Sequence, residues 1–428
     1  MRPFRHMLDA ARRPSPAWVE RRVKALVDHA GRHVPYYRDL MAAKGLARGD
    51  IRSLADFVDH FPRTDSADYR RAQHVRGAAY LIDERLDADA LRLNISSGTS
   101  GMPLRHFQSA AERAVHLGRW RRHYLAAGLR PWHRALAVLN LGPNETSIGR
   151  LAAVLDRAGL FHRRVVHYLT PVDEIVDVLM AGGHDALYGQ KAMLARIAER
   201  VLERRPEGYP LRFLAPGAEK VTEPDRALFQ AAFRPARYVE FYGAVELQLM
   251  AIRRRGDYQI DHRAAFLTLA DPAPNGDLTV GRNLATSLIH QAQPILNLDL
   301  GDEIAMRHFD RVLALGATIA EVRGRSNDQL VLPDGGRVTG AEFYAALKVF
   351  PFMRQFRIRQ SRLDACEILV RLASETPENV AAVEAAVHAV LRGRIDHDLT
   401  CVDDIPIGPG GKYKILESTL GRPDGKAP

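Results

Sequence analysis

Apolar residues in the first ninety positions recur at the spacing of an α-helix. Val19, Val23, Leu26 and Val27 fall on one helical face, and the apolar residues of 54–58 repeat the spacing. Side chains three or four positions apart lie on the same side of a helix, so this pattern predicts amphipathic helices that pack on a core. We expect a helical N-terminal segment.

From about residue 135 the pattern changes to short β-rich runs that alternate with amphipathic stretches. The β-rich runs are Ala135–Asn140, Arg164–Leu169, Asp185–Tyr188, Leu211–Leu214 and Arg237–Tyr242. The helical stretches are 146–159, 172–181, 191–204 and 223–232. Such alternation predicts an α/β fold with a doubly wound, largely parallel sheet, whose ligands bind at the carboxyl ends of the strands.

Two later changes of pattern predict further parts. After about residue 256, short strands and turn signals such as Pro274-Asn275-Gly276-Asp277 predict a β-rich subdomain. From about residue 325 we expect a small α+β domain that comprises a helix at 340–349, strands at Phe356–Gln360 and Glu367–Leu372, a helix at 377–391 and a strand at Thr400–Val402. We therefore predict a large domain, 1–324, and a small mobile C-terminal domain, 325–428, with the boundary at 324–327.

The composition is that of a folded protein, because 46% of the 428 residues are apolar and 26% are charged. Two cysteines, Cys366 and Cys401, cannot form a disulfide framework or a four-ligand metal site. This indicates a reducing compartment, and we expect the cytoplasm. No apolar run has the length of a membrane helix, and the basic start leads into no secretory apolar stretch.

The net charge of +10 raises the hypothesis of a polyanion-binding protein. The basic residues are spread among acidic ones along the chain, and this lack of clustering weighs against nucleic acid or a membrane as partner. None of the 17 histidines shows the spacing and acidic third ligand of a zinc enzyme; we interpret His116 and His123 as surface residues. No Gly-x-Ser-x-Gly segment indicates a hydrolase.

The segment that most strongly suggests a functional site is residues 91–103, Leu-Arg-Leu-Asn-Ile-Ser-Ser-Gly-Thr-Ser-Gly-Met-Pro. A strand leads into a loop whose hydroxyls and N–H groups can surround a polyphosphate. The loop lacks the spacing of a Walker motif, and taken alone a plain surface loop remains the alternative.

Two further segments are predicted to leave a strand through a glycine turn into a helix: 213–219 and 240–246. In the second, Tyr242 can stack on a base and Glu246 can bind Mg²⁺, the alternative being a core tyrosine and a glutamate at a helix start. Polar turn segments at 299–302, 323–328 and 405–412 follow.

In order and spacing, these segments resemble the motifs of the adenylate-forming enzymes, and in particular the branch of phenylacetate-coenzyme A ligases, deazaflavin-cofactor synthetases and capsular-polysaccharide adenylate-forming proteins. Ser96–Pro103 resembles the phosphate loop of that family, Phe241–Glu246 its Tyr-Gly-x-Thr-Glu, and Gly411-Lys412 its catalytic Gly-Lys. The segments Val34-Pro35-Tyr36-Tyr37-Arg38 and Phe61-Pro62-Arg63-Thr64-Asp65 also resemble this branch. The resemblance covers about residues 34–418.

The resemblance implies a large ATP-binding domain and a small domain that rotates about a hinge at Asn327. It implies Lys412, Glu246 and Thr99 as catalytic residues, with Thr99 and Glu246 as ligands of Mg²⁺. The residues implied to bind ATP or AMP are Ser96, Ser97, Gly98, Thr99, Ser100, Gly101, Gly217, Ala218, Glu219, Tyr242, Gly243, Asp302 and Arg325.

Some positions depart from the family pattern. Met102 replaces the lysine of the phosphate loop, Val245 replaces a threonine, and Asn297-Leu298 replaces Arg-Tyr. Lys412 is retained, so the adenylation hypothesis stands. Residues 253–262 contain none of the branch's cysteines, and we therefore predict no structural metal.

The predicted function is ATP- and Mg²⁺-dependent adenylation of a small carboxylic acid, followed by acyl transfer to coenzyme A. An amine, an alcohol or a carrier protein as acceptor, and a non-catalytic nucleotide-binding homologue, remain alternatives, and a homodimer stays open. The substrate pocket is predicted to contain Asn140, Gly142, Tyr188, Gln190 and Lys191. These polar residues suggest a polar or additionally acidic substrate with Lys191 as its counter-charge, the alternative being a solvated Lys191.

Overall fold

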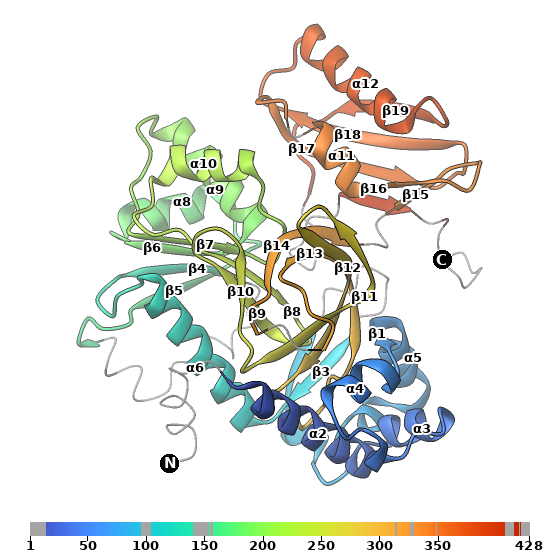
Figure 1. Cartoon of the computed structure of the whole chain (residues 1–428). Coiled ribbons are helices and arrows are strands. Elements are labelled where there is room, and N and C mark those ends of the chain that lie inside the picture. Colours follow the sequence, from blue (N-terminus) through green and yellow to red (C-terminus); the bar gives the residue numbers. More distant parts are fainter. Residues whose placement is uncertain are drawn as a thin grey trace.

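The computed structural model describes residues 14–95, 104–139, 154, 157–312, 315–325, 329–347, 349–406, 415–418 and 420, with main chain alone at Arg325 and Ala341. Its elements form a helical N-terminal segment, a parallel sheet, a large mixed sheet and a C-terminal α+β unit (Figure 1). In none of the described helices is there a stretch long and apolar enough to cross a membrane.

The N-terminal segment is helical, as predicted. Ser15 caps the first helix, which buries Val19, Val23, Leu26 and Val27 on one face. Each such side chain contributes about 1.5–3 kcal/mol when it leaves water, and this fixes the helix on the mixed sheet. The elements are α2 (Pro16–His33), α3 (Pro35–Ala43), η2 (Arg48–Asp50), α4 (Leu54–His60), β1 (Thr64–Asp65), α5 (Ser66–Arg76), η3 (Ala78–Leu81) and η4 (Ala88–Ala90).

The parallel sheet has the strand order β5-β4-β6-β7. Three helices pack on one face of it and a fourth packs on the other, so the predicted α/β layering is confirmed for this part of the chain. Most of the helix predicted over 146–159 lies outside the described residues. The elements are α6 (Ala110–Ala127), β4 (Ala135–Leu139), β5 (Arg163–His167), α8 (Val172–Ala181), β6 (Ala186–Gln190), α9 (Lys191–Arg204), β7 (Phe213–Gly217) and α10 (Glu223–Phe233).

The prediction of a fifth parallel strand at Arg237–Tyr242 is wrong. One parallel bridge, between Leu214 and Tyr238, joins the chain to β7. The strand then begins at Glu240 and pairs antiparallel with its successor, so it belongs to the mixed sheet. The β-rich part thus starts about fifteen residues earlier than the sequence pattern indicated, because a buried parallel strand and a buried antiparallel strand have the same apolar run.

The mixed sheet has the order β11-β12-β13-β14-β10-β9-β8, and β1 adds to β13 in parallel. The predicted turn at 274–277 is confirmed: Gly276 takes a φ of +63°, which favours glycine, between two long strands. The elements are β8 (Glu240–Ala244), β9 (Gln248–Arg253), β10 (Tyr258–Ile260), β11 (Ala265–Asn275), β12 (Leu278–Ser287), β13 (Leu298–Arg307) and β14 (Thr318–Arg325); a separate hairpin consists of β2 (Arg92–Ile95) and β3 (Arg105–Gln108).

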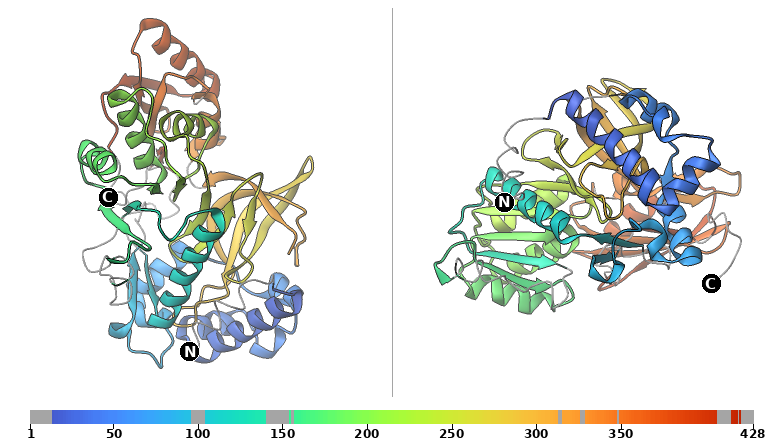
Figure 2. Two further views of the ribbon diagram at one scale, coloured as in Figure 1. Left: turned by 90° about the vertical axis from the view of Figure 1, so that its left-hand side faces the viewer. Right: turned by 90° about the horizontal axis from the view of Figure 1, so that it is seen from below.

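We call the described residues from 329 to 418 the C-terminal unit. It has a hydrophobic core of its own around Phe343, Phe356 and Ile368. In Figures 1 and 2 it lies beside α9 and α10, at the far end of the molecule from the N-terminal helices. The elements are β15 (Gln329–Val331), β16 (Arg337–Thr339), α11 (Gly340–Leu347), β17 (Met353–Gln360), β18 (Ala365–Leu372), α12 (Pro377–Leu391), β19 (Asp396–Cys401) and β20 (Leu416–Ser418).

The sequence predicted both helices and the strands β17 and β18 to within a few residues, and it did not predict β15, β16 and β20. The strand expected at Thr400–Val402 begins earlier, at Asp396, because it pairs along its length with β18. The division of the chain into domains at 324–327 stays a prediction.

Candidate functional site

The first part of the candidate site is the exit from β7. The strand ends at Gly217, Ala218 takes a φ of +67°, and α10 begins at Glu223 with the side chain of Thr222 as its cap. The predicted sequence of strand, glycine turn and helix is therefore confirmed. A non-glycine residue in the left-handed region is uncommon and bends the chain sharply, and here the bend precedes Glu219.

Lys191 faces this exit from the start of α9. Its Nζ lies 3.7 Å from Glu219 Oε2 and 3.6 Å from Asp225 Oδ2. The residue is 8% exposed, so the alternative of a solvated lysine is wrong. Because α9 follows β6 without a loop, the first residue of the helix is held in the layer between sheet and helices. Its role toward a substrate stays a prediction.

Gln190 and Tyr188 precede Lys191 on β6 and point to different surroundings. Oε1 of Gln190 is buried and accepts no hydrogen bond from any described residue, so it is open to a donor from a ligand. Tyr188 instead packs toward α6, with its ring centroid 4.9 Å from that of Tyr124. Burial raises the pKa of the Tyr188 hydroxyl.

Tyr188 belongs to a cluster of five aromatic side chains that we call the aromatic cluster: Trp120, Tyr124, Tyr188, Phe213 and Phe241. Its two α6 members, Trp120 and Tyr124, were missed by sequence reasoning. Their spacing of four residues, which places both on one helical face, was the signal that could have found them.

The second part of the site joins β8, β12 and β13. The Tyr242 hydroxyl donates to Asp302 Oδ2 at 2.9 Å and accepts from Asn283 Nδ2 at 2.9 Å. Asp302 is paired in register with Arg325 on β14, so the main chains of these two predicted nucleotide-binding residues are direct neighbours. The structure thus brings together three predicted nucleotide-binding residues that are far apart in the sequence.

Asn283 is a residue of this part that the sequence did not indicate. Its side chain is fully buried, and its Oδ1 has no hydrogen-bond partner among the described residues. A buried acceptor without a partner costs about 1–3 kcal/mol, so an adjacent donor, such as an exocyclic amine of a base, would be stabilised there.

The prediction that a helix follows Tyr242 is wrong. The chain does not enter a helix; β8 turns directly into β9, and Glu246 lies buried in the turn. Gly243 permits this turn, because a Cβ at that position would clash with the carbonyl oxygen of Gln248. The alternative of a glutamate at a helix start is therefore also wrong.

The early motifs that resemble the family fix the strand of Asp302. Thr64 pairs in register with Leu298 on β13, and its amide donates to Asn297 O at 3.2 Å. The Tyr37 hydroxyl accepts from the Leu296 amide at 3.0 Å. The Asn297 side chain in turn donates to Phe61 O at 2.9 Å. Asn297, where the sequence differs from the family pattern, thus takes part in the contacts that fix β13.

The remaining predicted site residues lie outside the described part of the chain, and their geometry stays a prediction: Ser96, Ser97, Gly98, Thr99, Ser100, Gly101, Met102, Asn140, Gly142, Asn327 and Lys412. For Arg325 the main chain alone is described. Of the two predicted ligands of Mg²⁺, the described one is Glu246, whose carboxylate is of the kind this cation prefers. No group of three or more metal-binding side chains occurs among the described residues.

The interpretation of His116 and His123 as surface residues is wrong. His116 is 4% exposed, and its Nε2 lies 2.8 Å from Nε2 of the fully buried His290. His123 Nε2 lies 2.7 Å from Asp261 Oδ2, which also accepts from Arg119. The face of α6 that carries both histidines packs on the 261 and 290 loops, and tertiary burial of this kind leaves no periodic signal in polar residues.

A third buried histidine, His106, gives a testable pH dependence. Burial lowers its pKa to about 4 from the ordinary 6.5. Between pH 6.5 and pH 4 the unfolded chain then binds a proton that the folded chain does not, so stability falls as the pH is lowered through this range. The loss is about 3 kcal/mol at pH 4. We expect thermal melting of His106→Gln, which cannot titrate, to vary less between pH 7 and pH 4.5 than that of the wild type.

The control for this experiment is the exposed His74. His74→Gln should reproduce the wild-type pH dependence of melting. An equal slope for His106→Gln and wild type would show that His106 does not govern acid stability.

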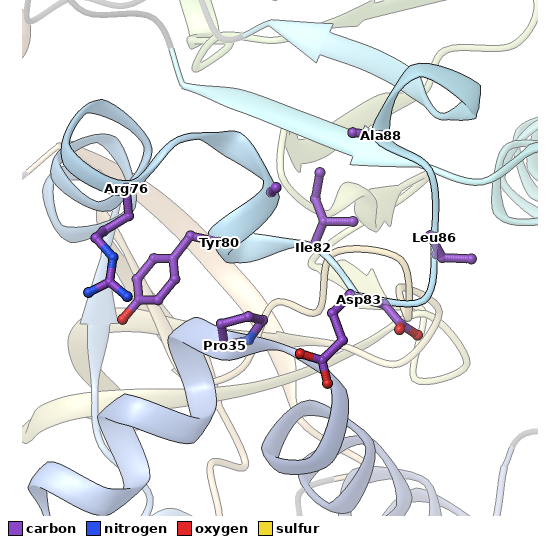
Figure 3. Close-up of a pocket in the computed structure, with 9 residues that line it drawn as sticks. Pro35, Arg76, Tyr80, Ile82, Asp83, Leu86 and Ala88 are labelled. Atoms are coloured by element: carbon purple, nitrogen blue, oxygen red, sulfur yellow. The ribbon is translucent and has the colours of Figure 1, made fainter.

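A hollow of about 380 Å³ on the N-terminal helices is separate from these residues (Figure 3). The Arg76 guanidinium lies 4.5 Å from the Tyr80 ring centroid, and the Tyr80 hydroxyl donates to Asp39 at 2.7 Å. Arg76 and Tyr80 thus already have partners within the protein, and no predicted site residue lines the hollow.

Comparisons with known proteins agree with this arrangement. No family model matches the chain. The phenylacetate-coenzyme A ligase of Thermus thermophilus is 24% identical in an alignment of length 385 that covers 83% of this chain and 81% of that protein. The amide bond synthetase McbA from Marinactinospora thermotolerans matches with a TM-score of 0.52 at 14% identity, over 96% of this chain and 97% of that one.

Two solved states of one ligase match to different degrees. 2-Hydroxyisobutyryl-CoA ligase in the post-adenylation state with 2-HIB-AMP has a TM-score of 0.73 at 18% identity, over 94% of this chain and 88% of that one. In the thioesterification state with 2-HIB-AMP and CoA, its TM-score is 0.56 at 17% identity, over 94% and 89%. The chain therefore has the fold of these ligases. In sequence it is similar to a phenylacetate-coenzyme A ligase.

Proposed function

We propose that the protein activates a carboxylic acid as an acyl adenylate, with release of pyrophosphate, and transfers the acyl group to coenzyme A. The observation that carries this proposal is the meeting of Tyr242, Asp302 and the Arg325 main chain on three strands, where the superfamily resemblance expects the nucleoside of ATP. The relatives include CoA ligases, which supports coenzyme A as the acceptor.

The chemistry requires positive charge and hydrogen-bond donors around the phosphates. Attack of a carboxylate oxygen on the α-phosphorus increases negative charge on the phosphate and on the departing pyrophosphate. In the proposed site the loop at 96–101 surrounds the β- and γ-phosphates, and Lys412 contacts the substrate carboxylate and the α-phosphate. Thr99 and Glu246 would hold Mg²⁺, which supplies further positive charge when it is bound.

The nucleoside would be bound by groups that fit it. Asp302 accepts hydrogen bonds from ribose hydroxyls beside Arg325, and the ring of Tyr242, held by its two hydrogen bonds, packs on the base beside Gly217-Ala218-Glu219. The unpartnered Oδ1 of Asn283 lies on the neighbouring strand β12. A carboxylate and a carbonyl acceptor are suited to hydroxyl and amine donors.

For the substrate we propose a polar carboxylic acid bound near Gln190 and Lys191. The free acceptor of Gln190 supports a polar substrate group. Two carboxylates already surround Lys191, which disfavours a second acidic group on the substrate unless one of them is protonated or displaced. Equal kinetics of wild type and Lys191→Ala across a panel of acids would remove Lys191 from substrate recognition.

The comparisons support the proposal that the C-terminal unit has the orientation that serves adenylate formation. The match to the post-adenylation state of 2-hydroxyisobutyryl-CoA ligase exceeds that to its thioesterification state at nearly equal identity. Because both are states of one ligase, we interpret the difference in TM-score as a difference in the arrangement of its parts. The proposal therefore includes a second orientation for acyl transfer, reached by rotation about Asn327.

The function is tested by following pyrophosphate release and thioester formation separately with ATP, coenzyme A and a panel of carboxylic acids. Release of both products supports the full proposal. Adenylate without thioester would indicate an amine, alcohol or carrier protein as acceptor, for which the amide bond synthetase is the relevant relative. No pyrophosphate with any acid would favour a non-catalytic nucleotide-binding homologue, an alternative that Met102 in the phosphate loop keeps open.

Glu246→Gln should lower the rate of pyrophosphate release and raise the Mg²⁺ concentration needed for half-maximal rate by about tenfold. The amide has the size of the carboxylate but no charge, so it is a weaker ligand for a hard cation. The measurement is a Mg²⁺ titration at saturating ATP. Glu203→Gln on the outside of α9 is the matched control, and an unchanged Mg²⁺ profile of Glu246→Gln would exclude Glu246 as a ligand.

A further inference from the structure

The C-terminal unit contacts the rest of the protein through the outer face of α9. Arg371 on β18 donates to Glu199 Oε2 at 2.8 Å, and Arg354 Nε on β17 lies 3.9 Å from Glu199 Oε1. The Glu199 side chain is only 13% exposed and the Arg371 side chain 24%. One carboxylate of α9 is thus enclosed by two arginines of the C-terminal unit.

A second pair on the same face has the opposite polarity. Arg196 NH2 lies 3.2 Å from Asp404 Oδ1, and Arg196 precedes Glu199 by three residues, so both lie on one side of α9. Arg371 also donates to Asp403 O at 3.1 Å, which ties the loop of Asp404 to β18. Because the signs alternate, a shift of one helical turn along α9 would bring like charges together.

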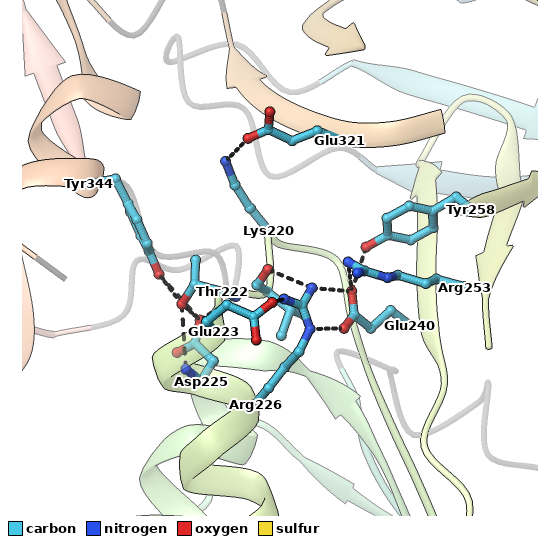
Figure 4. A network of polar contacts seen from close by, with 11 residues as sticks. Lys220, Thr222, Glu223, Asp225, Arg226, Glu240, Arg253, Tyr258, Glu321 and Tyr344 are labelled. Atoms are coloured by element: carbon cyan, nitrogen blue, oxygen red, sulfur yellow. Dashed lines mark hydrogen bonds and ion pairs between the residues drawn. The ribbon is translucent and has the colours of Figure 1, made fainter. Parts of the chain in front are cut away.

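A third contact reaches the candidate substrate region. The Tyr344 hydroxyl on α11 lies 3.0 Å from Thr222 Oγ1 and 3.2 Å from Asp225 Oδ2 (Figure 4). Burial raises the Tyr344 pKa to about 12, so the hydroxyl remains a donor at neutral pH. Asp225 is also one of the two carboxylates that face Lys191. The contact therefore lies one residue from the proposed substrate pocket.

We propose that these contacts, which we call the α9 latch, are positioning contacts that hold the C-terminal unit in the orientation for adenylate formation. The latch consists of Arg196, Glu199, Arg354, Arg371 and Asp404, with Tyr344 as its link to Asp225. In the sequence Lys412 precedes β20 of the same unit by four residues, and the proposed function requires this lysine to move with the unit. That this orientation serves adenylate formation rests on the proposed function. That the contacts hold the C-terminal unit in place does not depend on it.

The energetics favour a contact that can open. Exposed ion pairs contribute little, and enclosed pairs in a network contribute more, with coupling between partners of about 0.5–3 kcal/mol. A latch of this strength shifts the population of two orientations by about twofold to 150-fold. Rotation about the hinge would exchange these pairs for water without unfolding either part.

The test measures the distance between the two parts directly. Spin labels are placed at Ala126→Cys on α6 and Ala385→Cys on α12, both exposed, in a chain whose Cys366 and Cys401 are replaced by alanine. Pulsed electron paramagnetic resonance then gives the distance distribution without ATP or substrate. In Glu199→Arg, three arginines face one another, and we expect the fraction of molecules outside the main distance to rise about threefold to tenfold.

Two comparisons separate the latch from general damage. Glu203→Arg reverses a charge one turn along α9 that pairs within the helix, and it should leave the distribution unchanged. Glu199→Arg with Arg371→Glu restores an opposite pair and should recover most of the main distance. If Glu199→Arg melts at a much lower temperature, Arg196→Glu and its rescue by Asp404→Arg provide the same comparison at the second pair.

The activity arm measures pyrophosphate release and thioester formation in the same variants. Glu199→Arg should slow adenylate formation more than acyl transfer from preformed adenylate, by about threefold or more in the ratio, and the rescue variant should restore that ratio. An unchanged distance distribution in both charge reversals would overturn the latch. A changed distribution in a protein that releases no pyrophosphate with any acid would retain the latch and overturn the proposed function instead.

Discussion

Lys412→Ala should form adenylate about 10² to 10³ times more slowly than the wild type. One donor to the charge that develops on the α-phosphate contributes roughly 3–4 kcal/mol to the transition state. The measurement is pyrophosphate release in a single turnover at saturating ATP and acid. Binding of ATP should change little, because this interaction strengthens only as the charge develops.

Lys414→Ala is the matched control for Lys412→Ala, since it removes the same charge two residues away. It should retain most of the rate. A near-normal rate in Lys412→Ala, or equal losses in both variants, would assign the catalytic cation to another residue.

Asp302→Ala should raise the KM for ATP by about ten- to a hundredfold with a smaller change in kcat. Hydrogen bonds to a charged group contribute about 1.5–3 kcal/mol, and the ribose is bound equally in ground state and transition state. Tyr242→Phe separates two causes, because it removes the hydrogen bond to Asp302 and keeps the ring. It should raise the KM less than tenfold.

If Tyr242→Phe and Asp302→Ala raised the KM equally, Asp302 would act by holding Tyr242 rather than by binding ribose. Initial rates at varied ATP, with the acid saturating, decide between these outcomes. Melting curves of both variants serve as a check, because Asp302 joins two strands of the mixed sheet through Tyr242.

The sequence predicted the elements whose local pattern agrees with their final packing. The spacing of apolar residues changes between that of a strand and that of a helix in the same order in which strands β4 to β7 and helices α8 to α10 follow one another. A glycine and a capping residue also mark the start of α10 at Glu223. The strand at Glu240 was misassigned because its apolar run does not encode its partner. Pairing with β9 depends on a turn that local propensity at 243–247 does not specify.

For the candidate site, the sequence indicated motifs but not their contacts. That Asp302 and Arg325 are cross-strand partners follows from a register that is set only when β13 and β14 pair. The polar partners of Lys191 and His116 come from other elements, 28 to 174 residues away in the case of Glu219 and His290. Single-sequence periodicity contains no information on such pairs, so it placed His116 on the surface and left a solvated Lys191 open as an alternative.

The pairing of β1 with β13 has a consequence for how the chain is made. The Thr64 hydroxyl donates to Leu296 O across 232 residues of sequence, and the N-terminal helices pack on the same sheet. During synthesis these helices leave the ribosome long before β13, the strand on which they dock. Their apolar faces therefore stay exposed to solvent until about residue 300 emerges. We expect chains arrested near residue 260 to bind chaperones and to be cleaved readily by proteases, and resistance to cleavage to appear abruptly once β13 has been translated.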